Sequence, residues 1–199
     1  MIGHLDTSRL LGAGNTRRLM TVRTSLKCEL QIICIEGDFG MADYEFLLAK
    51  YNDIPQIIDI YHSLIGTPGC TWSIDYPNRE TAESDIESKS LYVLKKNGTI
   101  VAVASAGEFN ELGHLQWTLK VPCELARIGV IPTMQKQGIG TTILQNIIKT
   151  AKEKEFDGIR MLVSKTNPSA LALYDKNGFK KYGEVSMYGI DFYCYQIEI

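Results

Sequence analysis

A short run with two glycines, QKQGIG at residues 135–140, stands directly before an amphipathic segment. The first backbone N–H groups of a helix have no partner inside the helix and carry the positive end of its dipole, so they bind anions. Gly138 and Gly140 bear no side chain that would stand between phosphate oxygens and these amides. The run predicts a phosphate cradle, with an ordinary turn before a helix as the alternative that two glycines alone leave open.

Other phosphate-binding motifs fit this run less well. A nucleotide P-loop would end in G-K-[ST], and a dinucleotide fingerprint would place a glycine where Ile143 stands. A second glycine run, GAGNT at residues 12–16, lacks the apolar helix that a phosphate loop requires after it. We therefore place the anion site at residues 135–140.

Two segments resemble the cofactor motifs of the GNAT superfamily of N-acetyltransferases. The run ARIGVIPTMQKQGIGTTIL carries Gln135, Gly138 and Gly140 on the Q/R-x-x-G-x-G/A pattern of that superfamily. The run NPSALALYDKNGF is similar to its second cofactor segment, with an Asn seven residues before a Tyr and G-F after it. The resemblance covers about Met41 to Ile199. It implies an acetyl-CoA-dependent N-acetyltransferase with an α+β fold, in which helices flank a mixed, mostly antiparallel sheet.

The resemblance also implies roles for single residues. The backbone of Ile128, Gly129 and Val130 would pair with the pantetheine arm of acetyl-CoA as an added strand does. Asn167 would face the pantetheine or the acetyl end, and Tyr174 would lie near the sulfur as proton donor to the departing thiolate. A helix cap for Asn167 and a core aromatic for Tyr174 are the alternatives. The pyrophosphate would bind at the cradle, formed by Gln135, Lys136, Gln137, Gly138, Ile139, Gly140 and Thr141.

The general base is a separate question, because an amine must lose a proton before it attacks a thioester. Glu124 lies eleven residues before Gln135, which resembles the spacing of the histone acetyltransferase branch. The ribosomal-protein branch places a glutamate five residues before the Asn, where this chain has Leu162. Glu124 is the predicted base, and a structural carboxylate at a strand edge is the alternative. Cys123 has no histidine nearby in sequence to activate it as a nucleophile.

The predicted reaction is direct transfer of acetyl to a small-molecule or peptide amine in a ternary complex. Aromatic and acidic residues suit a cationic amine, although a solvated acidic face explains the glutamates equally well. The alternative function is a non-catalytic acetyl-CoA-binding sensor or regulatory module. The candidate acceptor side comprises residues 70–77, Glu80, Glu83, Glu108, Glu111 and Trp117.

Composition fits one globular domain with no unusual partner. Hydrophobic residues make up 45% and charged residues 22% of 199, which excludes a disordered chain. A net charge of -2 gives no electrostatic reason to bind nucleic acid. Five scattered cysteines without a C-x-x-C pair predict free thiols, no metal site and a reducing, cytoplasmic location. No apolar run is long enough to span a membrane, and homodimer formation is left open.

The elements that must position these residues follow from periodicity. Apolar spacing predicts a helix after Asp53, which would cap it, with Gly66 at its end. Asn97-Gly98 predicts a two-residue hairpin between two strands within 91–109. Apolar residues from Ile143 to Ala151 predict the helix after the cradle. The remaining expected elements are strands at 45–50, 124–130, 159–163, 182–187 and 191–197, a short helix within 78–89, and a helix from Asn167-Pro168 to Gly178.

Residues 1–40 differ in composition from the rest and are expected to be an extension of uncertain role, followed by the acyltransferase-like domain at 41–199. Up to Lys27 the segment carries four Arg and one Lys against one Asp. This balance resembles a transit peptide, and an added upstream region is the alternative.

We predict that a chain starting at Met41 folds and binds acetyl-CoA as the full chain does, because all recognised motifs lie after it. Circular dichroism and calorimetric titration check this. An insoluble short chain, or one that has lost cofactor affinity, would make residues 1–40 part of the structure.

Overall fold

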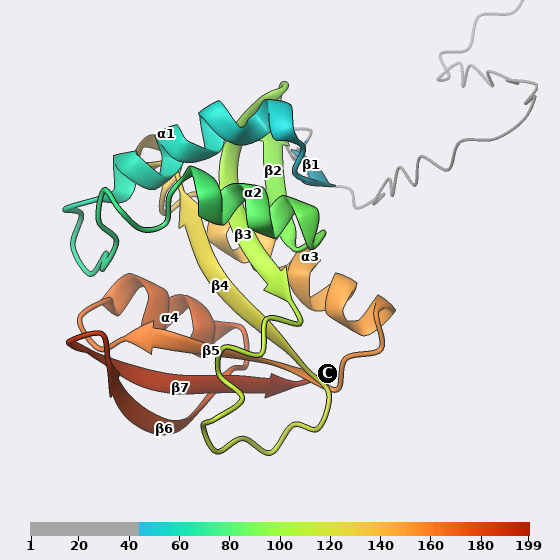
Figure 1. Ribbon diagram of the computed structural model, residues 1–199, viewed down its shortest axis with the longest axis vertical. Coiled ribbons are helices and arrows are strands. Elements are labelled where there is room, and N and C mark those ends of the chain that lie inside the picture. Colours follow the sequence, from blue (N-terminus) through green and yellow to red (C-terminus); the bar gives the residue numbers. More distant parts are fainter. Residues whose placement is uncertain (1–43) are drawn as a thin grey trace, which may run out of the picture. The chain divides into compact units, whose positions relative to one another are not determined.

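The computed structural model describes residues 44–199, so the expected extension at 1–40 lies outside the described residues (Figure 1). One seven-stranded sheet runs through it in the order β1-β2-β3-β4-β5-β7-β6. Every neighbouring pair is antiparallel except β4 and β5, which are parallel. The mixed, mostly antiparallel sheet with flanking helices is confirmed. The strands are β1 (Tyr44–Leu48), β2 (Leu91–Lys96), β3 (Thr99–Gly107), β4 (Pro122–Val130), β5 (Gly158–Ser164), β6 (Lys180–Met187) and β7 (Ile190–Glu198).

Helices cover both faces of the sheet. Val93 of β2 packs into a cluster with α1 and α2, whereas its neighbours Tyr92 and Leu94 pack into a second cluster with α3. Successive strand residues point to opposite faces, so these two clusters are the two faces of the sheet. Tyr174 of α4 belongs to the α3 cluster. The helices are α1 (Ile54–Leu64), α2 (Arg79–Glu87), α3 (Ile139–Glu153) and α4 (Pro168–Lys176), with 3-10 turns η1 (Tyr51–Asp53) and η2 (Pro132–Met134).

The expected elements are all present, with shifts at their ends. Asn97 and Gly98 both have positive φ, of 50° and 77°, as the predicted hairpin turn requires. The apolar stripe of α3 is buried as expected and extends back to Ile139. Among the described residues, no helix has the length and apolar character that crossing a membrane requires.

The predicted cap of α1 is wrong. Asp53 has helical backbone angles at the end of η1, and its side chain makes no cap hydrogen bond to α1. Its carboxylate turns back instead, accepting from the backbone N–H of Lys50 at 2.9 Å and pairing with Lys95 Nζ at 2.7 Å. The Asp53 carboxylate therefore accepts from two nearby donors outside α1, and it does not accept from the N-terminal amides of that helix.

The central feature of the sheet is that β4 and β5 part soon after they meet (Figure 1). Only Pro122, Cys123 and Glu124 of β4 pair with β5. Further along β4, Arg127 has a φ of 51°, and the register with β3 shifts between Val103 and Ser105. Such a bulge bends a strand and increases its twist. The backbone edge of β4 beyond Glu124 is left without a strand partner on the β5 side.

Candidate functional site

The start of α3 has the properties of an anion cradle. Gly138 precedes the helix with a φ of 85°, and no side chain caps the first amides of α3. A Cβ at Gly138 would meet no atom within 4 Å, so this position is open. Lys136, with a φ of 60°, turns the chain just before it. Unpartnered helix amides beside an open glycine fit a phosphate group.

Gly140 lies in the first turn of α3, facing α4. A Cβ there would lie 3.4 Å from Leu173 of α4, which is an ordinary van der Waals contact. Its predicted role in the cradle stays a prediction.

Two glutamines of the predicted site shape the cradle. Gln135 Nε2 donates to the carbonyl of Val130 at 3.1 Å, and Gln137 Nε2 donates to the carbonyl of Thr133 at 3.2 Å. The first bond ties the loop to the end of β4. The cradle and the free edge of Ile128–Val130 are thus held together, as a single extended ligand would require.

Gly129 lies under the loop that joins α1 to α2. A Cβ at this position would be 2.7 Å from Leu64 Cδ1 and 3.1 Å from Trp72. Trp72 of the α1–α2 loop, residues 65–78, therefore packs on the sheet face at Gly129, beside the strand edge predicted for pantetheine. Gly69 of this loop packs on Asn167, where a Cβ would stand 2.5 Å from the Asn167 Cα.

Asn167 stands directly before the first turn of α4, and Tyr174 lies in its last turn. Asn167 Oδ1 accepts from the amide of Ala170 at 3.0 Å, so the helix-cap alternative is a real contact. Tyr174 is 3% exposed and packs edge-on to Phe179 with 5.6 Å between ring centroids. Burial raises the pKa of Tyr174 above its usual value, so the phenol is protonated at neutral pH.

Glu124 is buried and surrounded by donors. Its Oε1 accepts from Arg160 Nε at 3.0 Å and from the amide of Leu112 at 3.1 Å, and its Oε2 accepts from the amide of Glu111 at 3.0 Å. These contacts fix the β3–β4 loop, residues 108–121, to the sheet where β4 and β5 part. They agree with the alternative of a structural carboxylate, and the base role stays a prediction.

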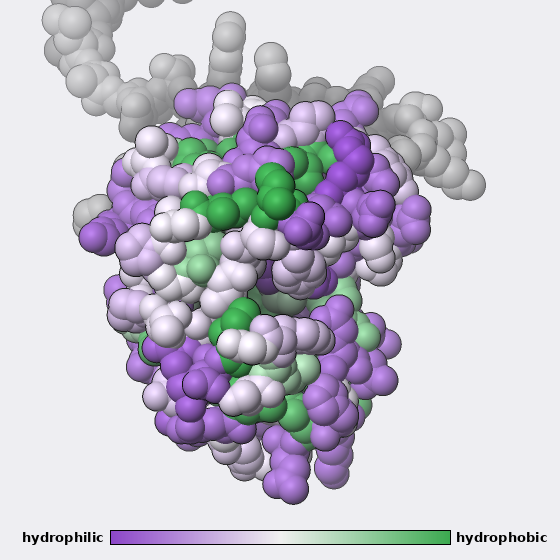
Figure 2. Space-filling model, turned by 60° about the vertical axis from the view of Figure 1, so that its left-hand side comes forward, coloured by the Kyte–Doolittle hydropathy of each residue, from purple (hydrophilic) through white to green (hydrophobic). Residues whose placement is uncertain are grey.

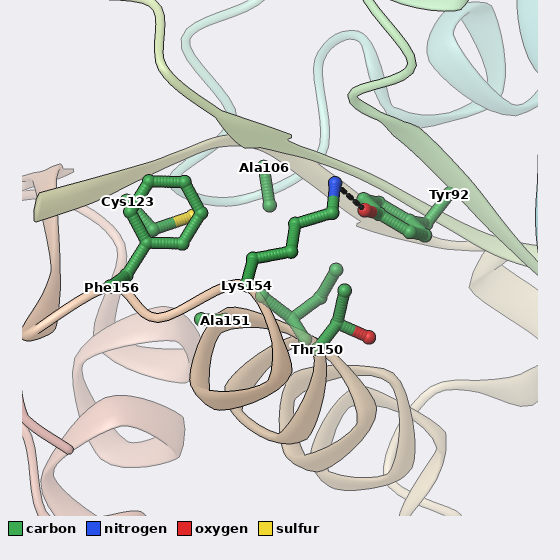
Figure 3. A pocket seen from close by; sticks show the side chains of 8 residues that line it. Tyr92, Ala106, Cys123, Thr150, Ala151, Lys154 and Phe156 are labelled. Atoms are coloured by element: carbon green, nitrogen blue, oxygen red, sulfur yellow. Dashed lines mark hydrogen bonds between the residues drawn. The ribbon is translucent and has the colours of Figure 1, made fainter.

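Cys123 faces the other side of the sheet, in a small cavity against α3 (Figure 3). Burial raises the pKa of this thiol to about 12, which keeps it protonated. Lys154 reaches across the cavity and donates to the Tyr92 hydroxyl at 2.8 Å. The cavity has about 10 Å³, room for a single water at most. A wider depression of about 450 Å³ near Phe109 and Phe156 is not lined by predicted cofactor residues.

Two buried arginines are the functional-site residues that the sequence interpretation missed. Arg160 of β5 pairs with Glu124, and Arg127 of β4 pairs with Asp85 of α2 at 2.8 Å. Each is a charged residue inside an otherwise apolar run, IRMLV at 159–163 or LARIGV at 125–130. A charged residue within an apolar strand was the sequence signal for these ion pairs, since a buried charge needs a partner.

The side of the molecule that carries the α1–α2 loop is partly apolar. Figure 2 turns the left-hand side of Figure 1 forward and shows apolar side chains gathered among polar ones there. Ile74, Tyr76 and Tyr188 are 64%, 47% and 88% exposed.

Among residues 44–199, no cluster of His, Cys, Asp or Glu could hold a metal ion.

Known proteins that are similar to this chain in sequence or in fold are acetyltransferases. A curated N-alpha-acetyltransferase from Sulfolobus acidocaldarius is 28% identical over 144 residues, which cover 70% of this chain and 81% of the relative. An N-acetyltransferase from Staphylococcus aureus Mu50 has a similar fold, with a TM-score of 0.64, 22% identity, and 78% and 98% of the two chains covered. An acetyltransferase from Salmonella typhimurium, solved with its cofactor acetyl-CoA, gives a TM-score of 0.64 at 17% identity, with 78% and 94% covered.

The family assignment rests on a match to the sequence pattern of a whole family. The pattern of the acetyltransferase (GNAT) family matches residues 57–179, which include β4, the cradle and α4. These segments contain Gly138, the free edge of β4 and Tyr174. The chain therefore belongs to the acetyltransferase (GNAT) family, and acetyl-CoA is its acyl donor.

Proposed function

We propose that the chain transfers the acetyl group of acetyl-CoA to a primary amine while donor and acceptor are bound together. One observation carries this proposal: the uncapped amides of α3 stand just after β4, whose edge beyond Glu124 has no strand partner. A diphosphate on the amides and an extended chain along that edge would complete both sets of hydrogen bonds. The similarity to a protein named N-alpha-acetyltransferase supports an α-amine as the acceptor.

The donor side of the proposed site uses backbone groups and one phenol. Residues 135–141 hold the diphosphate, and the backbone of Ile128–Val130 holds the pantetheine arm, beside Asn167. Tyr174 is protonated because burial raises its pKa, which is the form that a proton donor needs. A thiol has a reference pKa of about 8.5, so the phenol keeps its proton more tightly than the product thiol does. We therefore assign Tyr174 a hydrogen bond that stabilises the departing thiolate.

The proposal contains no protein nucleophile. Cys123 is protonated and lies on the face packed against α3, and the ionisable neighbours in its cavity, Lys154 and Tyr92, are hydrogen-bonded to each other. The amine therefore attacks the acetyl carbon directly. The expectations of a cytoplasmic location and of a homodimer stay predictions.

Profiling acceptors by release of free thiol tests the function. Amino acids, peptides, amines and polyamines are each incubated with acetyl-CoA and the full chain, and CoA thiol is measured. We expect release with primary amines and acetylated product by mass spectrometry. Tight acetyl-CoA binding without release for any acceptor would instead favour the sensor or regulatory module.

Gly138→Asp should abolish acetyl-CoA binding and leave the fold intact. The added carboxylate would stand against the diphosphate in otherwise open space. Left-handed backbone at this position costs an aspartate about 1 kcal/mol, which a new cap on the α3 amides offsets by a similar amount. Calorimetric titration and thermal melting measure the two effects.

Gly98→Asp is the matched control for this change. Gly98 also has a positive φ, of 77°, and no atom within 4 Å of an added Cβ, but lies in the β2–β3 turn. This variant should bind acetyl-CoA like the wild type. Unchanged affinity in Gly138→Asp would remove the cradle from the proposal.

Tyr174→Phe should keep acetyl-CoA affinity and lower kcat. The substitution removes one hydroxyl from a buried ring that packs on Phe179 and Tyr195. Because a thiolate is a tolerable leaving group, we expect a loss near the lower end of proton-donor effects, about 10²-fold. Tyr182→Phe, on the exposed edge strand β6, is the control. Full activity of Tyr174→Phe at every pH would make Tyr174 a packing residue only.

Glu124→Gln separates the two roles of that carboxylate by pH. A general base matters most at low pH, where the amine is protonated, so its loss should lower kcat/KM there and recover as pH approaches the pKa of the amine. An anchor of the β3–β4 loop should instead give the same fractional loss at every pH. Profiles of kcat/KM for the wild type, Glu124→Gln and the surface control Glu153→Gln decide between them.

A further inference from the structure

The most strained residue of β4 carries a buried charge. Arg127 has left-handed backbone angles inside a strand, with a φ of 51°, which an ordinary side chain rarely adopts. Its side chain is 4% exposed and that of its partner Asp85 is 6% exposed. Burial works against the charge of Arg127, but Asp85 and Tyr76 together outweigh it and hold the pKa of the guanidinium above its usual value. Arg127 therefore stays charged at any working pH.

Three of the five N–H donors of Arg127 and both carboxylate oxygens of Asp85 are engaged within the protein. Asp85 Oδ2 accepts from Arg127 Nε at 2.8 Å and from Ser105 Oγ at 2.5 Å, and Oδ1 accepts from Arg127 Nη2 at 3.0 Å. Phe109 covers the guanidinium at 5.0 Å. Arg127 is therefore not a site for an external anion. Its one outward contact is from Nη1 to the Tyr76 hydroxyl, at 2.9 Å.

Tyr76 is the residue through which this network reaches the surface. Its hydroxyl oxygen accepts from the guanidinium, so its own proton stays available, and within residues 44–199 no acceptor takes it. The ring is 47% exposed. The backbone of Tyr76 is held by two hydrogen bonds with Ser73, of 2.8 and 3.3 Å. A hydrogen bond received from a charged donor strengthens the hydroxyl as a donor in turn.

The position of Tyr76 is that of an acceptor contact. Its loop places Trp72 on Gly129 and Gly69 on Asn167, next to the edge predicted for pantetheine. The opposite face of β4 is filled by the core that packs on α3. An acceptor must therefore approach the acetyl group from the face on which Tyr76 lies.

We infer that Tyr76 determines acceptor specificity by donating a hydrogen bond to an oxygen beside the reacting amine. The chemical class that this donor fits is an α-amine followed by a carbonyl, as in an amino acid amide or a peptide N-terminus. A polyamine offers only donors at this position and would face the Tyr76 proton and the Arg127 charge behind it. The inference rests on the proposed function and adds the residue that selects among amines.

Tyr76→Phe tests the inference with two acceptors, alaninamide and 2-aminobutane, which has an ethyl group in place of the carboxamide. The wild type should prefer alaninamide. The variant should lose about ten-fold or more in kcat/KM on alaninamide, as for a hydrogen bond to a strong donor, and less than two-fold on 2-aminobutane. The control is Tyr182→Phe, at a tyrosine on β6 that is 51% exposed, and it should leave kcat/KM unchanged on both amines.

Several further outcomes are decisive. An equal loss on both amines, or none on either, overturns the inference, as does a wild type without preference. Acetyl-CoA affinity and melting temperature should be unchanged in Tyr76→Phe, and a fall in both would make Tyr76 merely structural. If the wild type acetylates neither amine, the proposed α-amine acceptor fails, and calorimetric binding of alaninamide to wild type and variant in the presence of acetyl-CoA then decides the Tyr76 contact by itself.

Discussion

The parting of β4 from β5 after three paired residues is the constraint around which the rest of the site is built. Backbone N–H and C=O groups in a sheet interior need partners, and an edge left open inside a molecule is a place for an added strand. The bulge at Arg127 bends β4 away, and the Gln135 side chain then ties the end of β4 to the cradle. A strand edge and a helix start thus meet at one position, although each alone would be an ordinary feature of an α+β protein.

Two buried arginine–carboxylate pairs fix the loops around this opening. Arg127 with Asp85 holds the α1–α2 loop through Tyr76, and Arg160 with Glu124 holds the β3–β4 loop through two backbone amides. Removing one partner of such a buried pair costs about 3–5 kcal/mol, because it leaves a charge without compensation. The pairs are therefore better understood as devices that give the two loops a single arrangement than as sources of net stability. Preorganised loops matter here because a second substrate must meet the thioester in a defined orientation.

The sequence predicts the helices and strands well because they depend on local patterns. Apolar periodicity, Asn97-Gly98 and the glycines before α3 are read within windows of a few residues. The wrong cap at Asp53 and the contact that was not foreseen at Glu124 both involve partners that are distant in the chain: Asp53 turns to Lys95, and Glu124 meets Arg160. Tyr76 and Arg127 are 51 residues apart in the chain. The residue with left-handed backbone angles at the bulge is an arginine, so the usual sequence signal for such angles, a glycine, is missing there. The periodicity of apolar residues predicts which face of a strand is buried, but tertiary packing decides which polar groups come into contact.

The surroundings of Glu124 and Tyr174 bear on which amine the site suits. Both oxygens of Glu124 are engaged by donors, and Tyr174 keeps its proton, so neither group takes a proton from an amine without losing contacts that the fold uses. An α-amine with a pKa of about 7.8 is neutral in about one molecule in seven at pH 7, whereas a lysine-type amine with a pKa of about 10.4 is neutral in about one in 2,500. If Glu124 acts only as an anchor, the site would work far better on an α-amine than on an alkyl amine. This argument from the pKa of the amine and the proposed donor at Tyr76 rest on different observations, and both favour the α-amine that we propose as the acceptor.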